Sequence, residues 1–209
     1  MAKTGKFITF EGGEGSGKST HIEHLVTRLR QEGYHVLIAR EPGGTEVGEQ
    51  IRHILQYSEQ SAAMVPETEL LLFCASRAQL VREVIQPALD DGTIVICDRF
   101  LDSTEAYQGH GGGVPRDRLR DLHRLIAGDF LPDLTLILDL PVELGLQRAQ
   151  AHTRFERMGR DFHERMRSGF LDIGQREQRR CVVIDAREEL AAVSLAVKAA
   201  VRERLGAPL

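Results

Sequence analysis

The feature that most constrains this chain is a glycine-rich stretch near its start, GGEGSGKS at residues 12–19. It matches the pattern G-x-x-x-x-G-K-[ST] at every fixed position. The apolar run at 7–10 predicts a strand before it, and apolar residues at 22, 25, 26 and 29 predict an amphipathic helix after it. A strand, this loop and a helix form the setting in which the motif holds the phosphates of a nucleoside triphosphate.

The residue types in the loop suit that ligand. Glycines let successive backbone N–H groups turn toward an anion, and the helix that begins near Ser19 adds its positive end. Lys18 can reach the β- and γ-phosphates, and the Ser19 hydroxyl can ligate Mg²⁺. A dinucleotide-binding turn is disfavoured because no G-x-G-x-x-G is present. The predicted ATP-binding residues are Gly12, Gly13, Glu14, Gly15, Ser16, Gly17, Lys18, Ser19 and Thr20.

Composition narrows the class of protein further. The chain has 209 residues and a net charge of −4, which gives no general electrostatic footprint for nucleic acid. Its three cysteines are scattered in apolar surroundings, as in a reduced, cytoplasmic protein. We expect neither a signal peptide nor a membrane helix, because the first strand follows the start closely and no apolar stretch is long enough.

Five short apolar runs alternate with helical patterns along the chain. This alternation predicts one α/β domain over residues 1–209, with a five-stranded parallel sheet and helices on both faces. The strands are expected at 7–10, 35–39, 94–97, 134–140 and 181–184. Among the helices, a long one is expected from 67 to about 86, ended by Pro87, and a short polar one at 102–108, followed by a flexible glycine hinge at 109–113.

Polar residues at the ends of two strands are candidates for ligand binding. The loop REPGGT at 40–45 is well placed to contact a substrate, although it also fits a plain turn in which Thr45 caps a helix. Asp98 and Arg99 end a buried strand, where charges are costly without a partner. Asp98 is a candidate Mg²⁺ group and Arg99 a candidate phosphate clamp, unless the two pair with each other.

Two other features are ambiguous from spacing alone. Phe73 and Arg77 lie four apart on a predicted helix, a spacing that favours a core ring and a solvated charge. From 148 to 160 the chain carries a histidine at 152 and arginines at 148, 154, 157 and 160. In a phosphate-binding protein this segment is typical of a closing lid, and the alternative is a solvated basic face.

Several motifs together resemble one family. They are EGGEGSGKST at 11–20, REPGGT at 40–45, FCASR at 73–77, and DRF at 98–100 with ST at 103–104 and AYQG at 106–109. In this order they resemble the bacterial type of thymidylate kinase, over nearly the whole chain. The resemblance implies transfer of the γ-phosphoryl group of ATP to dTMP, giving dTDP and ADP in dTTP biosynthesis, with Mg²⁺ and in a homodimer.

The resemblance also implies roles for the residues of an acceptor pocket. Phe73 would stack on thymine, Arg77 would donate to a thymine carbonyl, and Thr104 would bond the base edge with Ser103 nearby. Tyr107 would lie against the deoxyribose and exclude a 2′-hydroxyl. Arg99 with Arg40 or Arg52 would hold the acceptor phosphate. The implied dTMP-binding residues are Glu41, Pro42, Arg52, Phe73, Arg77, Arg99, Ser103, Thr104, Tyr107 and Gln108.

The chemistry implied needs no protein nucleophile, because phosphoryl transfer depends on positioning and charge neutralisation. The implied catalytic residues are Lys18, Arg99, Glu14 and Arg154. The lid departs from the family, since 148–156 is short and Thr153 replaces an aspartate. We expect Arg154 to reach the transferring phosphate, then Arg148, then Arg157 or Arg160. A kinase for another nucleoside monophosphate and a non-catalytic nucleotide switch are the alternatives.

Overall fold

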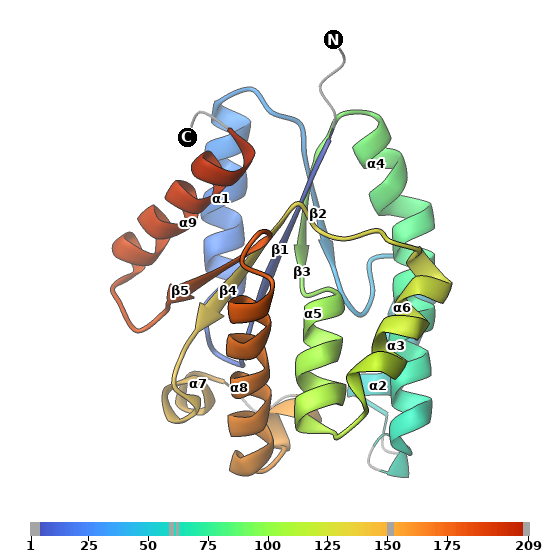
Figure 1. Ribbon diagram of the computed structural model, residues 1–209. Helices are drawn as coiled ribbons and strands as arrows, with labels where there is room; N and C mark the ends of the chain where they lie inside the picture. Colours follow the sequence, from blue (N-terminus) through green and yellow to red (C-terminus); the bar gives the residue numbers. More distant parts are fainter. Residues whose placement is uncertain (1–4, 59–60, 62, 150–152, 207–209) are drawn as a thin grey trace.

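The computed structural model describes residues 5–58, 61, 63–149 and 153–206. Its centre is a sheet of five parallel strands in the order β2-β3-β1-β4-β5 (Figure 1). The strands are β1 (Lys6–Gly12), β2 (Val36–Arg40), β3 (Ile94–Asp98), β4 (Leu134–Asp139) and β5 (Cys181–Asp185). All four pairings are parallel, so the predicted fold class is confirmed. Because β1 lies in the middle, the loop that follows it opens at the centre of the sheet edge.

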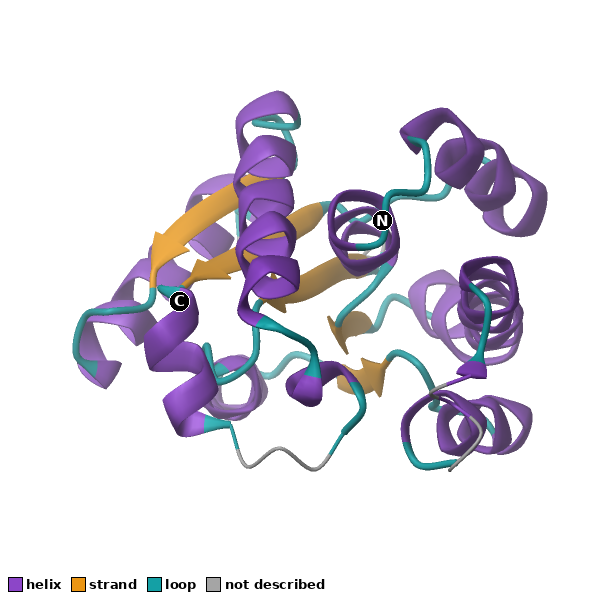
Figure 2. Cartoon of the chain, turned by 90° about the horizontal axis from the view of Figure 1, so that it is seen from below, coloured by secondary structure: helices purple, strands orange, loops and turns teal. Residues whose placement is uncertain are grey.

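Helices cover both faces of the sheet, as Figure 2 shows from below. On one face α1 (Lys18–Gln31) packs beside α9 (Leu190–Leu205), and both bury apolar side chains against β1 and β4. Ile8 and Phe10 face this layer, whereas Phe7 faces the opposite one, so the central strand is buried on both sides. The other helices are α2 (Glu46–Gln56), α3 (Pro66–Leu80), α4 (Gln86–Asp90), α5 (Leu101–Thr104), α6 (Arg116–Ala127), α7 (Val142–Arg148) and α8 (Arg160–Arg176).

The prediction that Pro87 ends the third helix is wrong. After α3 the chain makes a π-helical segment, η2 (Val81–Ile85), and then continues as α4 through Pro87 to Asp90. Proline lacks the N–H that an α-helix needs and its ring clashes with the preceding turn. The wider π turn directly before Pro87 changes the hydrogen-bond register, which lets the helix continue past the proline.

The prediction of a flexible glycine hinge at 109–113 is also wrong for residues 109–111, which are helical. The chain continues from α5 into a π-helical segment, η3 (Glu105–Gly111), which packs along α8. A Cβ on Gly111 would lie 2.6 Å from the Phe162 ring, so glycine is needed there for close packing rather than for bending. The short helix expected to be polar is therefore a buried element, and it carries several predicted site residues.

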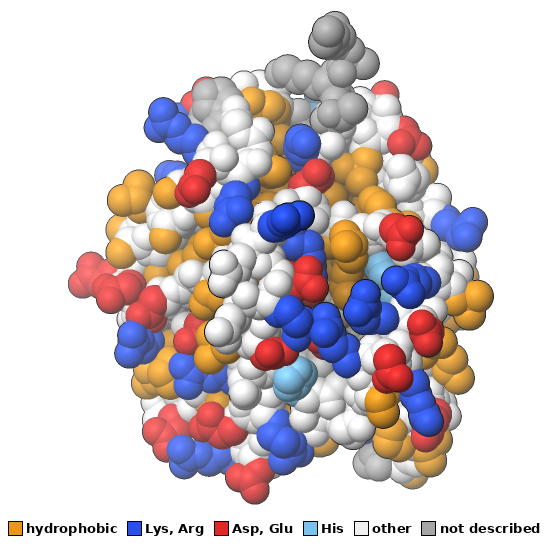
Figure 3. Space-filling model, in the orientation of Figure 1, with side chains coloured by type: hydrophobic (Ala, Val, Ile, Leu, Met, Phe, Trp, Pro, Cys, Tyr) orange, Lys and Arg blue, Asp and Glu red, His pale blue; other side chains and the backbone are white. Residues whose placement is uncertain are grey.

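The structure also shows where the cysteines and the charged residues lie. Cys74, Cys97 and Cys181 are free and buried, and burial raises the pKa of the Cys181 thiol to about 12. On the face shown in Figure 3, Lys and Arg side chains are interspersed with Asp and Glu. Among the helices of the described residues, none combines the length and the apolar character that crossing a membrane requires.

Candidate active site

The glycine-rich loop lies between β1 and α1, and its backbone can be built only with glycine at Gly15. That residue has φ +66°, and an added Cβ would lie 2.3 Å from the carbonyl oxygen of Gly145. Gly17 precedes α1 with φ +88°, also in the left-handed region. The loop therefore curls tightly around the first turn of α1, where free N–H groups face the end of the sheet.

Lys18 lies inside this curl and is almost fully buried. Its Nζ donates to the carbonyl oxygens of Gly12 at 3.2 Å and Gly13 at 3.0 Å. Burial lowers the pKa of Lys18, and Arg99 lowers it further, whereas Asp98, Glu14 and Glu11 act in the opposite direction. The ammonium group is thus held at the loop by main-chain oxygens, beside the positions that phosphates occupy in this motif.

A cavity of about 470 Å³ opens beside the loop at the carboxyl ends of β2 and β3. It brings together most of the predicted residues. Those that line it are Glu14, Gly15, Ser16, Gly17, Lys18, Ser19, Thr20, Glu41, Pro42, Arg52, Phe73, Arg77, Asp98, Arg99, Ser103, Thr104, Tyr107 and Gln108. Gly12, Gly13 and Arg154 are not among its lining residues.

Two of the lining residues fit the predicted Mg²⁺ site. The Oδ1 atom of Asp98 is buried and has no hydrogen-bond partner among the described residues. Ser19 is exposed in the same cavity. An unpartnered carboxylate oxygen and a hydroxyl are hard oxygen ligands of the kind that Mg²⁺ uses together with waters and phosphates.

Arg77 differs from the expectation based on spacing. It is 2% exposed, and its Nε and Nη2 donate to the Glu41 carboxylate at 2.9 and 2.7 Å. Nη2 also donates to the Thr104 hydroxyl at 2.8 Å. The solvated charge predicted from the helical pattern is therefore wrong. Its partners come from the loop after β2 and from α5, which a pattern within one helix cannot reveal.

Arg99 connects the acceptor side of the cavity to the loop. Its Nη1 donates to the Gly12 carbonyl at 3.0 Å and to the Ser103 hydroxyl at 3.1 Å, and its Nη2 donates to Glu14 at 3.2 Å. Its guanidinium also lies 4.9 Å from the centre of the Tyr107 ring, whose hydroxyl donates to Glu14 at 2.6 Å. Arg99 is thus engaged by the loop rather than by Asp98.

The charges of Glu14, Arg99 and Lys18 influence one another. Burial acts to raise the pKa of Glu14, but Arg99 and Lys18 outweigh it and hold that pKa below its ordinary value. Arg99 has φ 69°, an uncommon conformation for a residue other than glycine. Surrounding contacts must hold such a backbone in place, so the position of Arg99 is imposed by the fold.

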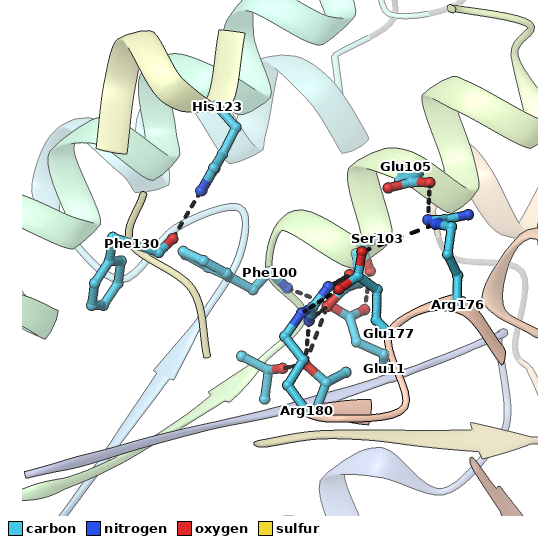
Figure 4. Close-up of polar contacts among 12 residues, drawn as sticks. Glu11, Phe100, Ser103, Glu105, His123, Phe130, Arg176, Glu177 and Arg180 are labelled. Carbon is cyan, nitrogen blue, oxygen red and sulfur yellow. Dashed lines mark hydrogen bonds and ion pairs between the residues drawn. The ribbon is translucent and has the colours of Figure 1, made fainter. Parts of the chain in front are cut away.

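Sequence reasoning missed Glu11, whose carboxylate binds the residues that follow Arg99 and so helps to hold the Arg99 backbone. Figure 4 shows its carboxylate turned toward Phe100 and Ser103, which donate to it from the backbone N–H at 2.8 Å and the hydroxyl at 2.5 Å. Burial raises the pKa of Glu11 to about 8. A carboxylate inside an apolar strand was the available signal, because such a group needs buried partners.

The predicted lid segment at 148–160 is described in part, and its residues 150–152, His152 included, lie outside the described residues. Arg148 ends α7 beside the loop, and a Cβ on Gly15 would lie 3.0 Å from the Cβ of Arg148. Arg154 instead lies away from the loop, with its Nη1 2.6 Å from Glu69 on α3. Arg148 lines the cavity and Arg154 does not, and which of them reaches the transferring phosphate stays a prediction.

A phosphate-binding loop at the tip of a central parallel strand, facing a buried and arginine-lined pocket in the same cavity, defines a P-loop phosphotransferase with a small acceptor. The comparisons with known proteins agree. The family model for thymidylate kinase matches residues 10–197. The chain belongs to the thymidylate kinase family, and it is therefore an enzyme.

Individual relatives are similar over almost their full length. Thymidylate kinase of Caulobacter vibrioides is 50% identical over 205 residues, which cover 97% of this chain and 98% of that protein. Thymidylate kinase of a Bradyrhizobium strain is 51% identical, covering 96% and 91%. The crystal structure of thymidylate kinase from Ehrlichia chaffeensis superposes with a TM-score of 0.75 at 36% identity, covering 93% of this chain and 97% of that one.

Proposed function

We propose that this protein transfers the γ-phosphoryl group of ATP to dTMP, giving dTDP and ADP for dTTP biosynthesis. The observation that carries the proposal is that one and the same cavity, of about 470 Å³, is lined on one side by the phosphate loop and on the other by the acceptor residues. Two phosphorylated ligands bound there would meet end to end. Catalysis of phosphoryl transfer consists almost entirely of such positioning together with electrostatic stabilisation.

The acceptor side suits a pyrimidine nucleotide. Phe73 offers a ring for stacking, and base–aromatic stacking contributes about 1–3 kcal/mol. Arg77 is held by Glu41 and Thr104 through Nε and Nη2, which leaves Nη1 to donate to a base carbonyl. Tyr107 is fixed by Glu14 and lines the cavity, where its ring would lie against the sugar and exclude a 2′-hydroxyl.

The transfer step relies on cations at the meeting point of the two phosphates. Lys18 would bind the transferring phosphate from the loop side, and Arg99 would hold the acceptor phosphate with Arg52 nearby. Mg²⁺ held by Ser19 and Asp98 would neutralise charge on the phosphate oxygens. Glu14 stays ionised because its pKa is lowered, so it can keep Arg99 in place during the reaction.

We propose Arg148 as the lid cation, because it lines the cavity beside Gly15. Arg154 is paired with Glu69 and is better suited to holding the segment in place.

We also propose a homodimer in the cytoplasm. Exposed apolar side chains lie on three helices, with Ile54 on α2, Leu71 on α3 and Leu125 on α6, the last 78% exposed. Helix α3 contacts both α2 and α6, so a second copy could cover these side chains together. The three buried free cysteines fit a reducing compartment.

An ADP-release assay with ATP, Mg²⁺ and a panel of monophosphates tests the function. We expect turnover with dTMP, weaker turnover with dUMP, and little with AMP or CMP. The methyl group that separates dTMP from dUMP is worth only about 1–3 kcal/mol. ADP release without an acceptor would instead indicate a nucleotide switch, and a preference for AMP or CMP would indicate a different kinase.

A further inference from the structure

We infer that Glu69 determines which base the acceptor cavity accepts, by fixing the amide orientation of Gln108. The inference rests on the proposed function and extends it to a residue that does not line the substrate cavity. Glu69 lies in the first turn of α3 and is 9% exposed. Its two carboxylate oxygens have different partners. Oε1 accepts from Nε2 of Gln108 at 2.8 Å, and Oε2 lies 2.6 Å from Nη1 of Arg154.

This pairing fixes the direction of the Gln108 amide. A carboxylate paired with a guanidinium can only accept hydrogen bonds, so Gln108 must turn its NH₂ group toward Glu69. Gln108 is buried at 4% exposure and lines the substrate cavity. The group that it can offer to a bound base is therefore its amide oxygen, which is an acceptor.

An acceptor at this position selects among pyrimidines. Thymine and uracil carry an N–H at position 3 and a carbonyl at position 4. Cytosine has a lone pair at position 3 and an amino group at position 4. The acceptor of Gln108 and the donor of Arg77 match the first pattern and oppose the second, and mismatched buried polar groups cost the full desolvation penalty. Glu69 is needed for this selection because, without its hydrogen bond, the Gln108 amide could rotate by 180° and present its NH₂ group to the base instead of its oxygen.

The same carboxylate also supports the segment beside the base. Arg154 directly precedes the short helix η4 (Phe155–Arg157), whose Phe155 is buried and lines the cavity. The Phe155 ring centre lies 5.9 Å from that of Phe73 and 5.8 Å from that of Tyr107. Through Arg154, Glu69 therefore also positions the ring that packs against the proposed base-stacking residue.

The decisive variant is Glu69→Gln, because an amide can both donate and accept and so no longer dictates the orientation of Gln108. The kcat/KM ratio of dTMP to dCMP is measured for the wild type and the variant. We expect the wild-type ratio to be about 10⁴ or more, as for sites built to hydrogen-bond a substrate group, and Glu69→Gln to lower it at least about tenfold. The matched control is Glu67→Gln, an exposed carboxylate in the same helical turn, which should leave the ratio unchanged.

A merely structural role for Glu69 would lower kcat/KM for both nucleotides by one factor and leave their ratio intact, and that result would overturn the inference. A second variant, Gln108→Met, removes the amide and should lower the ratio by itself. Adding Glu69→Gln to Gln108→Met should then change the ratio no further, whereas multiplying effects would show that Glu69 acts by another route.

Calorimetric binding of dTMP and dCMP separates this inference from the proposed function, since it needs no turnover. Selective dTMP binding that Glu69→Gln weakens, without phosphorylation by either protein, would refute the function and support the role of Glu69. Turnover of dTMP together with an unaltered binding preference in Glu69→Gln would support the function and refute the role of Glu69.

Discussion

Replacing Arg77 by methionine should destabilise the protein strongly, because it leaves a buried carboxylate without its partner. Both side chains of the Arg77–Glu41 pair are 3% exposed. Removing one member of such a pair costs about 3–5 kcal/mol. For a chain of this size, about 2–4 °C of Tm is lost per kcal/mol, so we expect a drop of about 6–20 °C. The exposed pair Arg40–Glu49 is the matched control, and Arg40→Met should cost about 1 kcal/mol or less.

The loss of stability in Arg77→Met should be smaller at acidic pH than at alkaline pH. Burial raises the pKa of Glu41 and Arg77 opposes that effect, so removal of Arg77 raises the pKa further. A carboxyl group whose pKa is raised in the folded state binds its proton more tightly there than in the unfolded chain, so its cost is greatest above the raised pKa and falls away as the pH drops from that pKa to the ordinary value of 4.5. The deficit of Arg77→Met should therefore be smaller at pH 5 than at pH 8.

Urea unfolding of wild type and Arg77→Met at pH 5, 6.5 and 8 measures this deficit directly. A second variant, Arg77→Met with Glu41→Leu, should recover most of the lost stability because no charge is left unpaired. A deficit below 1 kcal/mol, or one that is the same at every pH, would show that Glu41 is not an unpartnered buried charge in the variant.

Other residues of the site give sharper functional outcomes. Arg148→Ala should lower kcat about 10³-fold with little change in the dTMP KM, measured by steady-state kinetics beside Arg154→Ala; a larger kcat loss in Arg154→Ala would restore that residue as the lid cation. Gly15→Ala should abolish ATP binding in calorimetry because of its 2.3 Å clash, whereas Gly33→Ala, with no atom within 4 Å, should cost about 1–2 kcal/mol of stability and leave ATP affinity unchanged. Phe73→Ala should raise the dTMP KM about 5- to 150-fold, and wild-type values would exclude stacking on this ring. Chelation by EDTA should stop turnover and added Mg²⁺ restore it; continued turnover would exclude the metal.

The parts of the site that the sequence predicts well are those encoded within a few consecutive residues. The loop from Gly12 to Ser19 combines its chemistry and its strand–loop–helix setting in one stretch, so its position at the sheet edge follows from the motif. The five strands are likewise local, because each is a short apolar run between turns.

The features that could not be predicted depend on partners distant in sequence. Arg77 is buried because Glu41 lies 36 positions earlier and Thr104 lies 27 later, and nothing in the helix itself encodes either contact. Arg154 is drawn to Glu69 in the same way, from 85 positions away. The π turn before Pro87 is a different case, since it is a local rearrangement for which the sequence offers only the proline. Each of these features concerns where a side chain points or how a helix continues, not which elements exist.

The position of Glu14 has a consequence for the order in which ligands arrive. This carboxylate belongs to the loop that receives the donor nucleotide, yet it is bonded to Arg99 and Tyr107 on the acceptor side. A donor that shifted the loop would move Arg99 and Tyr107 with this carboxylate, and an acceptor that shifted those two residues would move the loop. Each nucleotide would then alter the affinity of the protein for the other, and thermodynamic reciprocity requires the two factors to be equal.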